Sequence, residues 1–308
     1  MRTLQNFPRL LRIALHWGLI LALLGVSVGS VCALFLWLLD QATQLRFLHP
    51  SLLIGLPVAG VGVALLYQRY GGRAAAGNNL IIDEIHKPGG GVPFCMAPLV
   101  LFGTVISHLF GASVGREGTA VQIGGSFAAA IGRLFRLNDR AMRLFLMAGI
   151  AAGFGAVFGT PVAGAIFGLE VLTLGRLDYA ALLPVAVASF VADWTCHAWG
   201  IHHAAYHVGF RGIPSADGTM FHVDALLLVK VSFAAVCFGL ASRAFALGVH
   251  RLAGIFQKLC PQAWLRPALG GVLTILLVGL LGTRDYLGLG VMSPDIDGAS
   301  IMNVFGPG

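Results

Sequence analysis

Charged side chains are scarce in this sequence. Asp, Glu, Lys and Arg make up 11% of the 308 residues, against about a quarter in an average soluble domain. Hydrophobic residues reach 57% and the mean hydropathy is +0.84, so the chain lacks the polar side chains that a water-facing surface needs. This composition excludes intrinsic disorder and a soluble domain. It predicts an all-α polytopic membrane protein surrounded by a lipid bilayer.

Cysteine is scarce as well, and acidic residues are outnumbered. The five cysteines are odd in number and show no C-x-x-C spacing, which predicts packing residues rather than disulfides or metal ligands. The chain has 20 basic and 13 acidic residues, which gives a net charge of +7. The basic residues stand between apolar runs without interleaved aromatics, so the positive-inside rule explains them better than a nucleic-acid partner. We predict no nucleic acid, no metal and no cofactor.

The first long apolar run extends from about residue 13 to residue 39 and follows Arg2, Arg9 and Arg12. It is too long for the hydrophobic part of a signal peptide, and no small-residue cleavage site closes it. The run therefore predicts a retained transmembrane helix. The basic residues before it predict a cytoplasmic N-terminus and a multi-pass protein of the cell (inner) membrane.

Further apolar segments follow, several of them shorter than the ~20 residues of a full crossing. They lie at about 51–67, 96–113, 119–135, 141–158, 161–174, 180–200, 223–250 and 265–289, and we expect no helix after the last of them. Gly- and Pro-containing stretches separate them at 77–79, 88–93, 115–118 and 159–161. Such interruptions are typical of broken helices that line a protein-enclosed cavity. Glycine pairs four residues apart, at 25 and 29, 149 and 153, and 164 and 168, predict close helix packing.

Glu117 is the most informative ionisable residue. It stands in Gly115-Arg116-Glu117-Gly118-Thr119, between two apolar segments, where a charged side chain is costly and so is a functional candidate. The apolar run after Thr119 predicts a helix start, whose free N–H groups and positive dipole end form an anion site. The carboxylate could occupy that site and leave it when protonated. The alternative is an interfacial Glu that caps the helix or pairs with Arg116.

Three motifs carry a resemblance to a known family. The stretch from Gly115 to Gly125 resembles the signature of CLC chloride channels and transporters, commonly G-R-E-G-P followed by V-Q-x-G. A second similar stretch runs from Ala156 to Glu170, and Gly77-Asn78-Asn79-Leu-Ile stands where the family has G-S-G-I-P. The resemblance implies a CLC-type fold of broken helices in two inverted repeats. It also implies a homodimer with one pore in each subunit.

The departures from the common pattern are similar to the fluoride-exporting branch of that family. Thr119 replaces a proline, Asn78 replaces the anion-binding serine, and Val171 stands where chloride/proton exchangers carry an internal glutamate. The resemblance thus implies a fluoride/proton antiporter in which Glu117 is both gate and proton carrier. The expected anion-binding residues are Asn78, Asn79, Gly115, Arg116, Glu117, Gly118 and Thr119.

Alternatives remain open for these residues. Asn78 and Asn79 could instead be helix N-cap or turn residues. Arg116 either adds positive potential or forms a loop ion pair. Thr119 is expected to support Glu117 from the helix N-terminus rather than to touch the anion itself.

The length of the second half affects the predicted domain. We expect one transmembrane domain over residues 1–308 without a soluble domain, with a first repeat at about 13–200 and a partial second repeat at about 223–290. The G-x-F-x-P helix start and late tyrosine of the family do not appear after Leu289. Two other functions therefore stay open: a passive channel or exchanger for chloride or other anions, and a truncated subunit that does not transport.

Two weaker patterns point to other chemistry. Gly111-Ala-Ser113-Val-Gly115 fits the G-x-S-x-G pattern of hydrolases, but that motif needs a strand–turn–helix context. A Ser/His protease would have to use His197 or His203 as its base. We expect that the chain is not an enzyme. His197, His202, His203 and His207 form a cluster that is better explained as an interfacial loop than as a metal site. Asp83, Glu84, His86 and Lys87 predict a solvent-facing approach to Asn78.

Overall fold

The described residues form helices and no strand. The structure, a computed structural model, describes residues 7–170, 178–203, 225–293 and 298–305. The α-helices are α2 (Phe7–Leu48), α3 (Leu56–Tyr70), α4 (Asn78–His86), α5 (Met96–Leu109), α6 (Glu117–Leu134), α7 (Asp139–Phe158), α8 (Pro161–Glu170), α9 (Leu182–Ala198), α10 (Ala225–Leu259), α11 (Arg266–Leu281) and α12 (Ile301–Phe305). Short 3₁₀ turns precede α3, α4, α9 and α11, at Pro50–Gly55, Gly72–Ala76, Tyr179–Ala181 and Ala263–Leu265.

Within the described ranges, six helical stretches are long and apolar enough to cross a bilayer. They are Leu15–Leu48, Pro50–Tyr70, Asp139–Phe158, Tyr179–Ala198, Ala225–Leu259 and Ala263–Leu281. Met96–Leu109 and Pro161–Glu170 are apolar but shorter. These lengths agree with the predicted membrane protein built from full and partial crossings.

α7 is the centre of the core and packs against α6, α9, α8 and α2. Its ends are set by local chemistry. Asn138 accepts a hydrogen bond from the Ala141 backbone N–H at 2.9 Å, and Gly159 ends the helix in the left-handed region at φ +65°. Its buried face carries small residues, so the neighbouring helices approach closely.

The predicted glycine contacts are present at these crossings. A Cβ at Gly149 or Gly153 would collide with the backbone carbonyls of Gly124 or Ala120 on α6. At Gly25, on α2, an added Cβ would lie 2.7 Å from the side chain of Val191 on α9. These glycines let α2, α6, α7 and α9 pack at a distance that alanine would prevent.

All four predicted interruptions coincide with helix ends. α4 begins directly after Gly77, α6 begins within the 115–118 stretch, and α8 begins at Pro161 after Gly159 closes α7. The 88–93 stretch connects α4 to α5. The breaks therefore place the starts of α4 and α6 at their sequence motifs.

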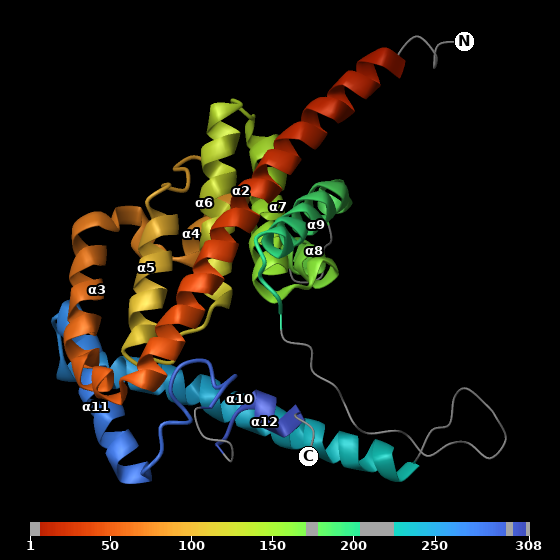
Figure 1. Cartoon of the computed structure of the whole chain (residues 1–308). Coiled ribbons are helices and arrows are strands. Elements are labelled where there is room, and N and C mark those ends of the chain that lie inside the picture. The colour runs from red at the N-terminus through yellow and green to blue at the C-terminus, as the bar shows by residue number, and fades with distance from the viewer. Residues whose placement is uncertain (1–6, 171–177, 204–224, 294–297, 306–308) are drawn as a thin grey trace.

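α10 and α11 lie apart from this core (Figure 1). α11 packs against α3, with Gly271 directly against the backbone of Leu56 and Pro57, whereas no residue of α10 is buried. The expectation of no helix after residue 289 is wrong. Ser300 Oγ accepts a hydrogen bond from the Asn303 N–H at 3.1 Å and thereby caps the short helix α12.

Candidate functional site

The N-terminus of α6 carries the Gly-Arg-Glu-Gly motif. Arg116 is the N-cap residue and makes no side-chain cap hydrogen bond, and Glu117 is the first residue of the helix. The first backbone hydrogen bond of this turn runs from the Ala120 N–H to the Arg116 carbonyl, at 3.0 Å. The N–H groups of Glu117, Gly118 and Thr119 therefore have no partner within the helix, and they face outward at its positive dipole end.

The Glu117 carboxylate folds back over this end of the helix. Its Oε2 lies directly against Gly115, so closely that a Cβ at position 115 would collide with it. The residue is exposed in the described chain. Gly115 thus provides the space into which the carboxylate turns.

Asn78 faces the same turn from α4. It is the first residue of that helix, after Gly77 at φ +60°, and the helix has no side-chain cap. Its Oδ1 accepts a hydrogen bond from Gln122 Nε2 at 3.1 Å. Its Nδ2 lies 3.4 Å from where a Gly118 Cβ would stand. Asn78 is therefore not an N-cap, and its amide hydrogens are directed toward the start of α6.

Gln122 was not among the predicted site residues, although it stands in the quoted V-Q-x-G run. Its contact joins residues 44 positions apart, which helical periodicity does not reveal. Asn79, the next residue after Asn78, is exposed.

A cavity of about 320 Å³ adjoins the motif. It is lined by Gly115, Gly118, Thr119 and Gln122, and on its opposite wall by residues of α3 and α5. Thr119 is buried, and its hydroxyl is 2.8 Å from the Thr104 hydroxyl on α5. The Thr119 side chain thus joins α6 to α5 beside the motif.

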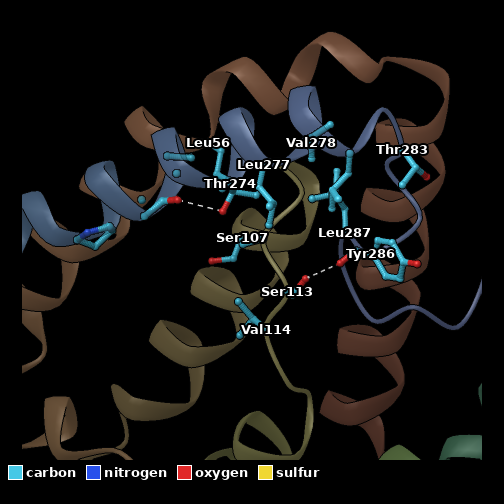
Figure 2. A pocket seen from close by; sticks show the side chains of 17 residues that line it. Leu56, Ser107, Ser113, Val114, Thr274, Leu277, Val278, Thr283, Tyr286 and Leu287 are labelled. Carbon is cyan, nitrogen blue, oxygen red and sulfur yellow. Dashed lines mark hydrogen bonds between the residues drawn. The ribbon is translucent and has the colours of Figure 1, made fainter. Parts of the chain in front are cut away.

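A second cavity of about 500 Å³ lies between α3, α5 and α11 and shares Ser107 and Val114 with the first. Figure 2 shows its lining, with Ser113 directed toward Tyr286. The Ser113 Oγ donates to the Tyr286 carbonyl at 3.1 Å. This serine lies in a coil between two helices, without the strand–turn–helix context that a nucleophile requires.

Arg116 points to the other side of the motif. Its guanidinium carbon lies 5.0 Å above the Phe158 ring at the end of α7, a cation–π contact. Within the part of the chain that the structure describes, no ion pair joins Arg116 to Glu117 or another acid. The loop ion pair considered from the sequence is therefore absent there.

The mixed-charge patch at the end of α4 is only partly solvent-facing. Asp83, His86 and Lys87 are exposed, but Glu84 is buried. The Glu84 carboxylate accepts hydrogen bonds from the N–H groups of Gly89, at 2.9 Å, and Gly90, at 3.2 Å. The expectation of a solvent-facing patch is wrong for Glu84, because the following glycine loop folds over its side chain.

The surroundings of Glu84 favour its charged form. Burial acts to raise the pKa of Glu84. Hydrogen bonds from the N–H groups of Gly89, Gly91 and Gly90, together with the positive charge of Arg73, lower it by more. The distance from Arg73 Nη2 to Glu84 Oε2 is 3.9 Å. The pKa of Glu84 therefore lies below its ordinary value of 4.5. Glu84 holds the α4–α5 connection as an ionised group.

The histidine cluster is assembled differently from what the sequence suggested. His197 and His203 approach each other, with ring centroids 5.5 Å apart, and Asp193, which the sequence reading had not selected, joins them. His202 is exposed beside them. His207 and Val171 lie outside the described residues.

Comparison with known proteins places this geometry in a family. The family model described as voltage gated chloride channel matches residues 59–295. A "Chloride/fluoride channel protein" of Pseudomonas syringae pv. tomato is 47% identical over 283 residues, which are 90% of this chain and 61% of the relative. The chain thus spans about three fifths of that relative's length.

Solved structures of two CLC-type antiporters have the same fold as this chain. A CLC-type fluoride/proton antiporter superposes with a TM-score of 0.81 at 31% identity, covering 90% of this chain and 68% of the other. A slow cyanobacterial Cl⁻/H⁺ antiporter superposes with a TM-score of 0.71 at 20% identity, covering 89% and 65%, and supports the fold alone. The signature at α6, the family match and the shared fold together show that this chain is a multi-pass membrane protein of the voltage-gated chloride channel (CLC) family.

Proposed function

We propose that this chain forms the anion site and gate of a fluoride/proton antiporter, with Glu117 as the group that both blocks the site and carries the proton. The observation that supports this most is the position of Glu117. Its carboxylate folds over Gly115 at the start of α6, with the Asn78 amide facing the same turn. The similarity to a "Chloride/fluoride channel protein" and to a fluoride/proton antiporter supports the choice of ion.

The donors at this turn suit fluoride. Fluoride is small and strongly hydrated, so several close hydrogen-bond donors must replace its water. The free N–H groups at Glu117, Gly118 and Thr119 are such donors, and Asn78 Nδ2 adds an amide N–H from α4. The hydrogen bond from Gln122 occupies Asn78 Oδ1, which leaves the Nδ2 hydrogens available to the anion.

Glu117 competes with the anion for the same donors. An ionised carboxylate at a helix N-terminus is stabilised by the same N–H groups that would hold fluoride. Protonation removes that attraction, so the side chain leaves and the anion enters. Because one proton accompanies each departure of the carboxylate, anion movement becomes coupled to proton movement.

The wider assembly is part of the proposal. By analogy with the family, the protein would work as a homodimer in the inner membrane, with a cytoplasmic N-terminus and one pore in each subunit. The single domain would comprise a first repeat at about 13–200 and a partial second repeat at about 223–290. Arg116 would contribute positive potential near the site, and Asn79 would lie at its edge.

Anion flux from liposomes tests the proposed function. The 308-residue chain is reconstituted into vesicles loaded with fluoride or chloride, with and without an inward proton gradient, and its fluoride binding is measured separately by calorimetry. We expect fluoride efflux to exceed chloride efflux, to increase with the proton gradient and to be accompanied by proton uptake.

Three outcomes would contradict the proposal in different ways. Chloride efflux as fast as fluoride efflux would overturn the selectivity. Fluoride efflux without proton movement would favour a passive channel. Fluoride binding without any flux would show that the chain does not transport alone, and absence of binding would overturn the anion site itself.

A further inference from the structure

Asp193, His197 and His203 form a cluster of metal-ligating side chains outside the anion site. One ligand atom from each lies within 4.8 Å of the others. Asp193 and His197 are four residues apart on α9, which places them on one face of the helix. The chain then turns at Gly200, with φ +82°, and brings His203 back against them.

Both histidines use one ring nitrogen on the backbone. His197 Nδ1 is 3.0 Å from the Asp193 carbonyl oxygen, and since a carbonyl only accepts, Nδ1 carries the proton. His203 hydrogen bonds to the Ala156 backbone. Its Nε2 makes no hydrogen bond, so this contact falls to Nδ1. In neutral histidine each Nε2 then holds a lone pair, the arrangement that backbone carbonyls impose on metal-ligating histidines.

Two buried polar atoms of the cluster make no hydrogen bond within the described structure. They are His203 Nε2 and Asp193 Oδ1, the latter 3.4 Å from His197 Nδ1. An acceptor that is removed from water and left unpaired costs about 1–3 kcal/mol. A cation held between these atoms would satisfy both.

The surroundings select the type of cation. The Arg116 guanidinium lies near His203 and adds positive charge on that side of the cluster. A hard ion such as Mg²⁺ or Ca²⁺ prefers several oxygens, and one carboxylate beside an arginine does not provide them. Two imidazoles and one carboxylate suit Zn²⁺ or a similar transition metal, which leaves one position open for water.

We propose that Asp193, His197 and His203 bind one transition-metal ion of the zinc class, contrary to the absence of a metal expected from the sequence. Ligand atoms around tetrahedral Zn²⁺ are about 3.4 Å apart, given bonds of about 2.0–2.1 Å, so atoms that lie within 4.8 Å of one another need to approach by at most about 1.4 Å on binding. The ion joins α9 to the end of α7, where the His203 ring packs directly against Gly159. The proposed metal site does not depend on the proposed transport activity.

Zinc binding by the tag-free, chelator-treated full chain in detergent tests this site. Calorimetry and metal analysis are expected to show about one Zn²⁺ per chain, and Co²⁺ is expected to give the visible absorption of a tetrahedral site. His197→Gln is the main variant because His197 is 44% exposed, so its replacement leaves the fold intact. We expect at least a tenfold loss of affinity, by comparison with the roughly 10- to 100-fold effect of outer-shell changes.

His86→Gln is the matched control. Its Nδ1 lies 2.8 Å from the Ile82 carbonyl, just as His197 Nδ1 contacts the Asp193 carbonyl, but it is not a member of the cluster. We expect this variant to bind zinc as the parent chain does, and Asp193→Asn to lose binding as His197→Gln does. Equal zinc affinity in the parent chain and His197→Gln would overturn the proposal, as would less than about a fifth of an equivalent bound at micromolar zinc.

Discussion

Gln122 Nε2 donates a hydrogen bond to Asn78 Oδ1 at 3.1 Å and so joins α6 to α4 across the candidate anion site. The contact engages the oxygen of the Asn78 amide and leaves Nδ2 the nearer atom to Gly118, at 3.4 Å against 3.8 Å for Oδ1 from where a Cβ would stand. Without it, the carbonyl oxygen could rotate toward the anion and repel it. Gln122 is thus a positioning residue for Asn78.

Gln122→Leu is expected to weaken fluoride binding about three- to tenfold, the effect of losing one typical hydrogen bond. The measurement is calorimetric fluoride binding to the chain in detergent. Gln68→Leu is the control, because Gln68 is an exposed glutamine of α3, and it should bind fluoride as the parent does. Unchanged affinity in Gln122→Leu would show that the amide orientation is not set by this contact.

The sequence predicted much of this site because motif and helix start coincide. The apolar run after Thr119 indicated a helix, and α6 does begin at Glu117. Gln122 was missed because its importance depends on α4 packing against α6, a long-range contact. The nine-residue helix α4 holds only a three-residue apolar run, Leu80 to Ile82, which is too short to predict a helix from the sequence.

The outcomes for the glycines, Glu84 and Asp193 also depend on whether a contact is local or long-range. Glycine spacing predicted which helix faces meet, since close packing depends only on residue size and period. Glu84 was expected in solvent because it stands among charged residues, but three following glycines let the loop return over it. Asp193 was not predicted because it stands within the apolar segment at 180–200, although its four-residue spacing from His197 places both on one helix face.

The Thr104–Thr119 hydroxyl pair predicts a non-additive stability effect. Both side chains are buried, and their oxygens are 2.8 Å apart. Thr119→Val leaves one buried hydroxyl unpaired and should destabilise the chain by about 1–3 kcal/mol. The double variant Thr104→Val/Thr119→Val should recover much of that loss, because it removes both polar groups. Thermal unfolding in detergent measures the difference, and simple additivity of the single variants would contradict a coupled pair.

Glu84 predicts acid sensitivity of the α4–α5 connection. Its pKa is lower in the folded chain than the ordinary value of 4.5, so the folded state favours the ionised form. Its contribution to stability is therefore complete above about pH 4.5 and is lost as the pH falls through the lowered folded pKa. Glu84→Gln should flatten the decrease of the unfolding temperature in acid. Asp83→Asn, which changes the exposed neighbour, should retain it, and identical acid profiles for Glu84→Gln and the parent would contradict this role.

Proton uptake by fluoride-loaded vesicles that contain Glu117→Gln tests whether Glu117 carries the proton. Glutamine imitates the protonated side chain in shape but cannot release a proton, so we expect loss of proton uptake while calorimetry still shows fluoride binding. Asp83→Asn is the control, because Asp83 is an exposed carboxylate on α4. Vesicles with this variant should take up protons at the parent rate. Near-normal proton uptake by Glu117→Gln would show that Glu117 does not carry the proton and only stabilises the start of α6.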